Sequence, residues 1–96
     1  MYAMAQDDDF AQRLYMLQKE ILSYFLQHPD AKDTVEGIMH WWLPGGGTRV
    51  KASDVGIILD ALVVKGWATV SSLGQGARVY GLDRAGHREI REWLEN

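Results

Sequence analysis

The 96-residue sequence contains no cysteine and only two prolines. The absence of cysteine excludes disulfide bridges, thiolate zinc sites and cysteine nucleophiles. No apolar run approaches the roughly 18 residues that a membrane-spanning helix needs. The first residues contain three aspartates and lack the basic start and apolar stretch of a secretory signal. We therefore expect a cytoplasmic protein with no membrane partner, whose fold is held together by its apolar core.

Charge of either sign is moderate in amount but unevenly distributed. Hydrophobic residues make up 47% of the chain and charged residues 24%, which is typical of a single globular domain, and the net charge is −3. Residues 1–48 contain three basic and seven acidic side chains, whereas residues 49–91 contain seven basic and four acidic ones. Binding of a polyanion depends on the local charge of the protein surface more than on the net charge. The negative net charge therefore does not exclude a nucleic-acid partner.

Helical periodicity appears first in residues 8–27, where apolar side chains recur at steps of three and four. The aspartates at 7–9 would favour the start of this helix, and Pro29 would end it. The segment is more apolar than one buried face requires, because Tyr15 and Leu22 lie on a second side. A well-buried first helix and a surface shared with a second copy of the chain both account for this pattern.

A second helix is predicted over residues 34–43. Asp33 offers a cap, and Glu36 lies three residues further on, as in a capping box. The proline and three glycines at 44–47 would end this helix. Residues 48–50 are extended in character and allow at most a short strand.

A third helix is predicted over residues 53–65. Ser53 would cap its start, and Gly66 would end it in the left-handed conformation. Its outward positions, opposite the apolar inner face, would be Gly56, Ile57, Asp60 and Val64.

After the third helix the period of the apolar residues changes from 3.6 to 2. Residues 67–82 predict a β-hairpin, with two glycines between its strands. Asp83 would cap a last helix over residues 84–94. The sequence therefore predicts a single α+β domain, mostly helical, that spans residues 1–96.

Two segments resemble winged helix-turn-helix proteins. Residues 59–68, Leu-Asp-Ala-Leu-Val-Val-Lys-Gly-Trp-Ala, are similar to the L-x-x-L-x-x-x-G-apolar junction that precedes the wing. Residues 78–86, Arg-Val-Tyr-Gly-Leu-Asp-Arg-Ala-Gly, are similar to the R-x-Y-x-L-T-x-x-G signature of the second wing strand and following helix, with Asp83 in place of the threonine. The chain most resembles bacterial transcriptional regulators of the MarR and PadR type, from about Leu14 to Leu94. This resemblance implies a three-helix core, a two-stranded wing and a C-terminal helix.

The resemblance also implies a function: binding of double-stranded DNA, with the third helix in the major groove and the hairpin in the minor groove, to regulate transcription. Ser53 could hydrogen-bond a base edge or a phosphate, and Ile57 could pack on a thymine methyl group. Basic side chains around this helix and the hairpin would contact phosphates. The predicted DNA contacts are Arg49, Lys51, Ser53, Gly56, Ile57, Gln75, Arg78, Arg84 and Arg88. Taken alone, each basic residue among them is more simply a solvated charge or an ion-pair partner; their grouping around one helix and one hairpin is what favours DNA contact.

Winged helices usually act in pairs, which doubles the number of phosphates that are neutralised. The first and last helices would form the interface of a homodimer through Phe10, Leu14, Leu17, Ile21, Ile90, Trp93 and Leu94. With no separate ligand domain, a small-molecule effector would lie between the subunits or be absent.

Other chemistry has little support in the sequence. Glu36 and His40 lie four residues apart on one predicted helix, but no third metal ligand has a recognisable spacing. We expect no enzymatic activity and no cofactor.

The alternative function is a winged-helix module that binds a protein instead of DNA. Its contact surface would be apolar and would include Ile57, Val63 and Val64 on the third helix. Asp60 favours this alternative, because its carboxylate would repel phosphates unless it accepts a hydrogen bond from a cytosine amino group. Trp41 lies off the apolar face of its helix and would be the tryptophan most exposed to a partner.

Overall fold

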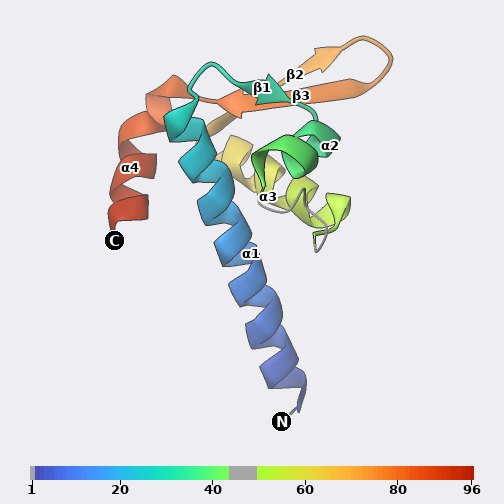
Figure 1. Ribbon diagram of the computed structural model, residues 1–96, viewed down its shortest axis with the longest axis vertical. Coiled ribbons are helices and arrows are strands. Elements are labelled where there is room, and N and C mark those ends of the chain that lie inside the picture. Colours follow the sequence, from blue (N-terminus) through green and yellow to red (C-terminus); the bar gives the residue numbers. More distant parts are fainter. Residues whose placement is uncertain (1, 44–49) are drawn as a thin grey trace.

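The computed structural model describes residues 2–43 and 50–96, with side chains described for residues 10–43, 50–72 and 74–96. The chain has an α+β fold in which the helices lie on one side of a small antiparallel sheet (Figure 1). The helices are α1 (Tyr2–Gln27), α2 (Val35–Gly37), α3 (Ala52–Lys65) and α4 (His87–Glu95). The strands are β1 (Lys32–Asp33), β2 (Ala68–Leu73) and β3 (Ala77–Leu82), in the order β1-β3-β2.

Helix α1 is longer than the sequence predicts. It begins at Tyr2 instead of residue 8, and its N-terminal end extends away from the rest of the chain (Figure 1). Residues 2–6 contain neither glycine nor proline, so nothing in them stops a helix. The aspartates at 7–9 therefore lie within the helix and do not mark its start. The predicted end before Pro29 is confirmed.

The predicted second helix is divided in two. Only Val35–Gly37 is α-helical, and residues Ile38–Trp42 form a wider π-helical turn, η1. The cap is Thr34 and not Asp33: the Thr34 hydroxyl accepts a hydrogen bond from the Gly37 N–H at 3.1 Å. The capping box is therefore wrong, because the residue three positions after the true cap is a glycine.

Asp33, the predicted cap, instead contacts the start of α2 from the preceding strand. Its carboxylate accepts a hydrogen bond from the Thr34 N–H at 2.8 Å and lies against Gly37, where a Cβ atom would collide with it. Its backbone belongs to β1, a strand that the sequence analysis missed. β1 pairs with β3 through Lys32 opposite Gly81 and Asp33 opposite Tyr80.

Helix α3 begins at Ala52, with Lys51 at its N-cap position and no side-chain capping hydrogen bond. The predicted cap Ser53 therefore lies in the first turn. The predicted end is confirmed: Gly66 has a φ of 84°, and its N–H donates to the last carbonyls of the helix.

The hairpin is confirmed within one residue of its predicted limits. Strands β2 and β3 pair from Ala68 opposite Leu82 to Leu73 opposite Ala77. The turn consists of residues 74–76, in which Gln75 and Gly76 both have positive φ, at 63° and 83°. Of the possible strand at 48–50, residues 48 and 49 lie outside the described residues, and Val50 is in no strand.

The last helix starts with a short 3₁₀ turn, η3 (Arg84–Gly86), before α4. The predicted cap is confirmed, because the Asp83 carboxylate accepts a hydrogen bond from the Ala85 N–H at 3.0 Å. Gly86 lies so close to the end of α3 that a Cβ atom would be 2.8 Å from the Gly66 carbonyl oxygen. This glycine therefore allows η3 to pack directly on the start of the hairpin.

The core lies between the sheet and helices α1, α3 and α4, and among the described residues it buries no polar or charged side chain. It consists of Leu17, Ile21, Leu22, Phe25, Ile38, Trp42, Leu43, Val55, Ile58, Leu59, Leu62, Trp67, Ala68, Tyr80, Leu82 and Ile90. Three residues of the predicted dimer interface, Leu17, Ile21 and Ile90, belong to this core. They are not available to a second copy of the chain, so that part of the prediction is corrected.

Candidate nucleic-acid interface

The outer face of α3 carries four side chains from successive turns: Ser53, Ile57, Asp60 and Val64. All four are exposed, Ile57 to 59% and Val64 to 88%, while the opposite face of the helix is buried. Spacings of three and four residues place these side chains in one row along the helix. We call these four residues the α3 row. The sequence predicted the outward position of its last three members, and the structure confirms it.

Gly56 lies beside this row, and none of the described residues makes a contact there that requires a glycine. It is in the interior of α3, where glycine destabilises a helix by about 1 kcal/mol relative to alanine. A Cβ atom added to it would have no described atom within 4 Å. The residue keeps the helix surface flat at this point, which allows another molecule to approach the backbone closely.

Asp60 is joined to the sheet by a hydrogen bond that the sequence analysis missed. The Tyr80 hydroxyl donates to Asp60 Oδ1 at 2.8 Å. The Tyr80 side chain is buried, and burial together with this hydrogen bond raises the pKa of Tyr80 above its usual value of 10.0. The nearby Arg78 guanidinium opposes part of that rise in the pKa.

The hairpin presents a second part of the surface. Residues Val70 and Ser72 of β2 lie opposite Tyr80 and Arg78 of β3, so their side chains share the face of the sheet from which Tyr80 reaches α3. Arg78 is exposed on that face, close to the hairpin turn. Gln75 is exposed in the turn itself. Arg78 and the α3 row are therefore on the same side of the molecule.

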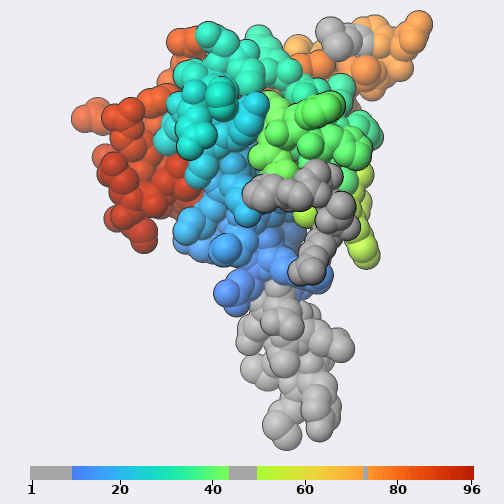
Figure 2. Space-filling view, in the orientation of Figure 1, coloured from blue at the N-terminus to red at the C-terminus, as the bar shows by residue number. Residues whose placement is uncertain are grey.

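The basic residues of the last helix are not part of this surface. α4 lies at the opposite end of the sheet from the hairpin turn (Figures 1 and 2). Arg84 forms an exposed ion pair with Asp30, and Arg88 is exposed on α4. The elements that carry Arg84 and Arg88 are therefore separated from the hairpin turn by the length of the sheet, and the contact of these two residues with DNA stays a prediction.

Two basic residues precede α3. Lys51 is exposed at the N-cap, where the free N–H groups and the helix dipole produce a positive potential. A bound anion would be stabilised there, and Lys51 would add to its attraction. Arg49, the other predicted contact, lies outside the described residues.

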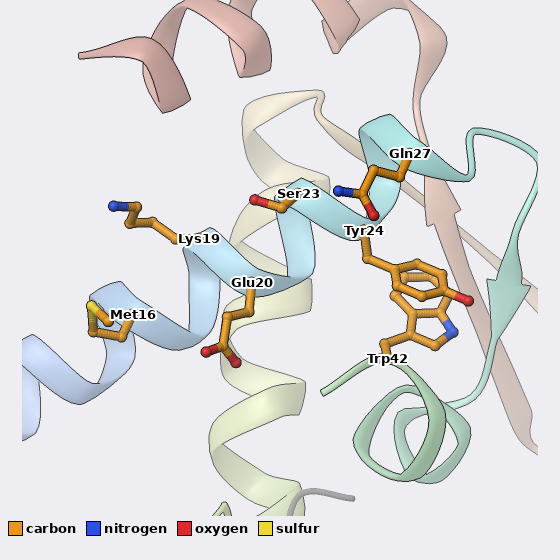
Figure 3. A pocket seen from close by; sticks show the side chains of 7 residues that line it. All are labelled: Met16, Lys19, Glu20, Ser23, Tyr24, Gln27 and Trp42. Carbon is orange, nitrogen blue, oxygen red and sulfur yellow. The ribbon is translucent and has the colours of Figure 1, made fainter. Parts of the chain in front are cut away.

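A shallow hollow of about 310 Å³ lies elsewhere on the molecule, between α1 and η1 (Figure 3). Its wall is the stacked pair of Tyr24 and Trp42, whose ring centroids are 4.4 Å apart. The α1 residues that line it are Met16, Lys19, Glu20, Ser23 and Gln27. Sequence periodicity gave no signal for this hollow, because it forms where two elements meet. Beside it, Trp41 is 78% exposed, as its position off the apolar face predicted.

In residues 2–43 and 50–96, no helix is long and apolar enough to span a membrane. Nor do the described side chains include three or more histidine or acidic residues grouped closely enough to hold a metal ion. Comparison with protein-family models, with curated proteins and with solved structures found no match to this chain.

Proposed function

We propose that this chain is a winged helix-turn-helix domain that binds duplex DNA and regulates transcription. In this proposal α3 enters the major groove and the β2–β3 hairpin is the wing. The observation that carries the proposal is the outer face of α3. There, a glycine that no described neighbour requires lies beside a row of exposed side chains, next to a hairpin that bears an arginine.

The order of the elements supports a winged-helix assignment. α1 is followed by the short β1, then by α2 and α3, and then by the hairpin, with β1 as the third strand of the sheet. This arrangement leaves the outer face of α3 uncovered by the other described elements while its inner face is buried. An uncovered helix with a hairpin beside it suits a duplex, because the major groove admits one helix and the backbone passes along its side.

The dimensions of the α3 row agree with direct contact to bases. Ser53 and Asp60 are seven residues apart, which corresponds to about 10 Å along a helix, or about three base pairs. Ile57, between them, could contact a thymine methyl group, and the Ser53 hydroxyl could donate to or accept from a base edge. Lys51 and Arg78 lie on elements that flank the row and would contact phosphates on either side of the groove.

The proposal includes a homodimer, because one chain offers few cations to the duplex. The predicted interface residues that remain outside the core are Phe10, Leu14, Trp93 and Leu94. Phe10 is 44% exposed on α1, and Trp93 contacts Tyr15 across the junction of α1 and α4, with ring centroids 5.4 Å apart. Light scattering at micromolar concentration tests this part; a monomer alone would contradict it.

The test of DNA binding is a titration of the protein with a random duplex at two salt concentrations. Because phosphate contacts release counterions, affinity should fall steeply with salt. The double variant Lys51→Ala/Arg78→Ala should bind more weakly to all sequences, with the slope of log K against log salt reduced by about 0.9 for each lost phosphate contact. The matched control Arg88→Ala/Arg91→Ala removes the same charge from α4 and should bind like the wild type. Absence of binding at low salt would overturn the proposal.

A second function is favoured by one observation: Ile57 and Val64 are both highly exposed and apolar, and Asp60 is acidic. A protein partner would cover these side chains without the repulsion that phosphates exert on Asp60. The same titration distinguishes the two functions, because a protein-binding module would show no salt-dependent affinity for the duplex.

A further inference from the structure

Asp60 is the one charged residue in the α3 row, and its charge has the wrong sign for contact with phosphates. If the row faces a duplex, the carboxylate must either weaken binding or find a hydrogen-bond donor on a base. One carboxylate oxygen is already occupied, since Oδ1 accepts from the Tyr80 hydroxyl. Among the described residues, Tyr80 is the only hydrogen-bond partner of this side chain, so Oδ2 is free to accept from outside the chain.

We infer that Asp60 determines sequence specificity: its carboxylate accepts a hydrogen bond from the N4 amino group of a cytosine in the major groove, and Tyr80 positions it for this contact. The inference rests on the proposed function and deepens it, because it names the base that one residue of the interface recognises.

Cytosine is the base whose edge matches a carboxylate. In the major groove, guanine presents two acceptors and thymine presents an acceptor and a methyl group, so both repel or exclude an ionised carboxylate. Adenine presents an amino donor with the N7 acceptor beside it. Cytosine presents its amino group without an acceptor on its own edge. An acceptor that cannot donate therefore selects cytosine over thymine most strongly.

Tyr80 is a positioning residue in this arrangement. Its ring is buried in β3, and its hydroxyl is therefore held at a fixed place relative to α3. The hydrogen bond restricts the rotamers of Asp60, so less conformational entropy is lost when the carboxylate meets a base. Arg78 lies two residues before Tyr80 on the same face of the strand, and its guanidinium opposes part of the rise in the Tyr80 pKa.

The experiment selects bound duplexes from a randomised pool with the wild type and with Asp60→Asn, and then measures the affinity of each protein for the selected duplex. The measurement is repeated with each cytosine in the recognised segment replaced by thymine in turn. For the wild type, one such replacement should weaken binding on the order of tenfold. Asp60→Asn should lose most of that discrimination at the same base pair only, because an amide can also donate to thymine O4.

Two further variants separate recognition from charge and from stability. Glu92→Gln removes one negative charge from α4 and should leave the preference for cytosine unchanged. Tyr80→Phe keeps the buried ring but loses the hydroxyl, and should reduce the discrimination at the same base pair without changing that at other positions. A general loss of affinity is what a purely structural role of Tyr80 would produce, and it would overturn the positioning role.

The outcomes distinguish this inference from the function on which it rests. If the wild type selects no duplex at low salt, both are overturned. If it binds DNA, but Asp60→Asn discriminates cytosine from thymine as well as the wild type does, only the assignment of Asp60 is overturned.

Discussion

Helices α3 and α4 each bury one face in the same core, but their outer faces differ in chemistry. The outer face of α4 carries Arg88, Glu89, Arg91, Glu92 and Glu95, all of them exposed. Arginines and glutamates four residues apart stabilise an exposed helix in water, and water is the only partner that such a face needs. The outer face of α3 carries a glycine and the exposed side chains of Ser53, Ile57, Asp60 and Val64, and contact with water does not account for the two exposed apolar side chains. This difference is the reason why the proposed interface is placed on α3 and not on α4.

The largest expected effect is a loss of stability when the buried faces are altered, and this loss should be similar in the two helices. Leu59 of α3 and Ile90 of α4 are both completely buried. Truncation of either to alanine should lower the free energy of unfolding by about 2–5 kcal/mol, because it removes apolar contacts and leaves a cavity. Chemical denaturation measures this change. A loss below about 1 kcal/mol for either variant would mean that its helix is not packed as described.

The next effect concerns the hydrogen bond between α3 and the sheet. Tyr80→Phe should lower the free energy of unfolding by about 1 kcal/mol at neutral pH. The raised pKa of Tyr80 means that above pH 10 the unfolded chain loses a proton that the folded chain keeps, so stability should decrease as pH rises through this range. Denaturation at a series of alkaline pH values should show a smaller decrease for Tyr80→Phe. Identical pH profiles would contradict the assigned cause of the shift.

A smaller effect, of opposite sign, is expected at Gly56. Gly56→Ala should raise the free energy of unfolding by about 0.5–1 kcal/mol, because alanine is the better helix former and the added methyl group meets no described atom. The same variant should bind duplex DNA more weakly, because the methyl group occupies space that the duplex needs. Thermal denaturation and the titration above measure the two effects. The control Gly66→Ala should destabilise the fold, because its φ of 84° disfavours any side chain.

The smallest effect is expected at the ion pair near the start of α4. Arg84 and Asp30 are 73% and 89% exposed, so solvent screens their attraction. Arg84→Ala should change the free energy of unfolding by less than about 0.5 kcal/mol and should leave duplex binding unchanged. A clear loss of DNA affinity in this variant would show that the duplex also reaches α4, and the contrast between the two helices would no longer hold.

The sequence predicts those parts of the fold that depend on neighbouring residues. The left-handed Gly66, the cap Asp83 and the glycine-containing turn of the hairpin are each determined by residues next to them, and each was found as predicted. β1 was missed because two residues carry no periodicity and become a strand only through pairing with β3. The start of α1 was misplaced because residues 2–6 contain no helix breaker, so the helix continues past the aspartates at 7–9 to Tyr2.

The candidate site follows the same rule. Helical periodicity predicted that Ile57, Asp60 and Val64 would be exposed, because one helix determines that property. It could not predict the hydrogen bond between Asp60 and Tyr80, whose residues lie 20 positions apart in different elements. Nor could it show that the hairpin and α4 lie at opposite ends of the sheet. The distance between Arg78 and the two arginines at 84 and 88 could therefore not be predicted from the sequence.

The wide turn η1 has a consequence for changes in chain length. Each of its hydrogen bonds spans five residues instead of four, so the turn holds one residue more than an α-helix would. Deletion of Trp41 would leave Ile38 and Trp42 three positions apart, a spacing that an ordinary α-helix also presents on a single face. The core contacts of both residues are thus compatible with two lengths of this segment. Trp41 is an exposed residue between them, so its deletion would keep both core residues on the buried face.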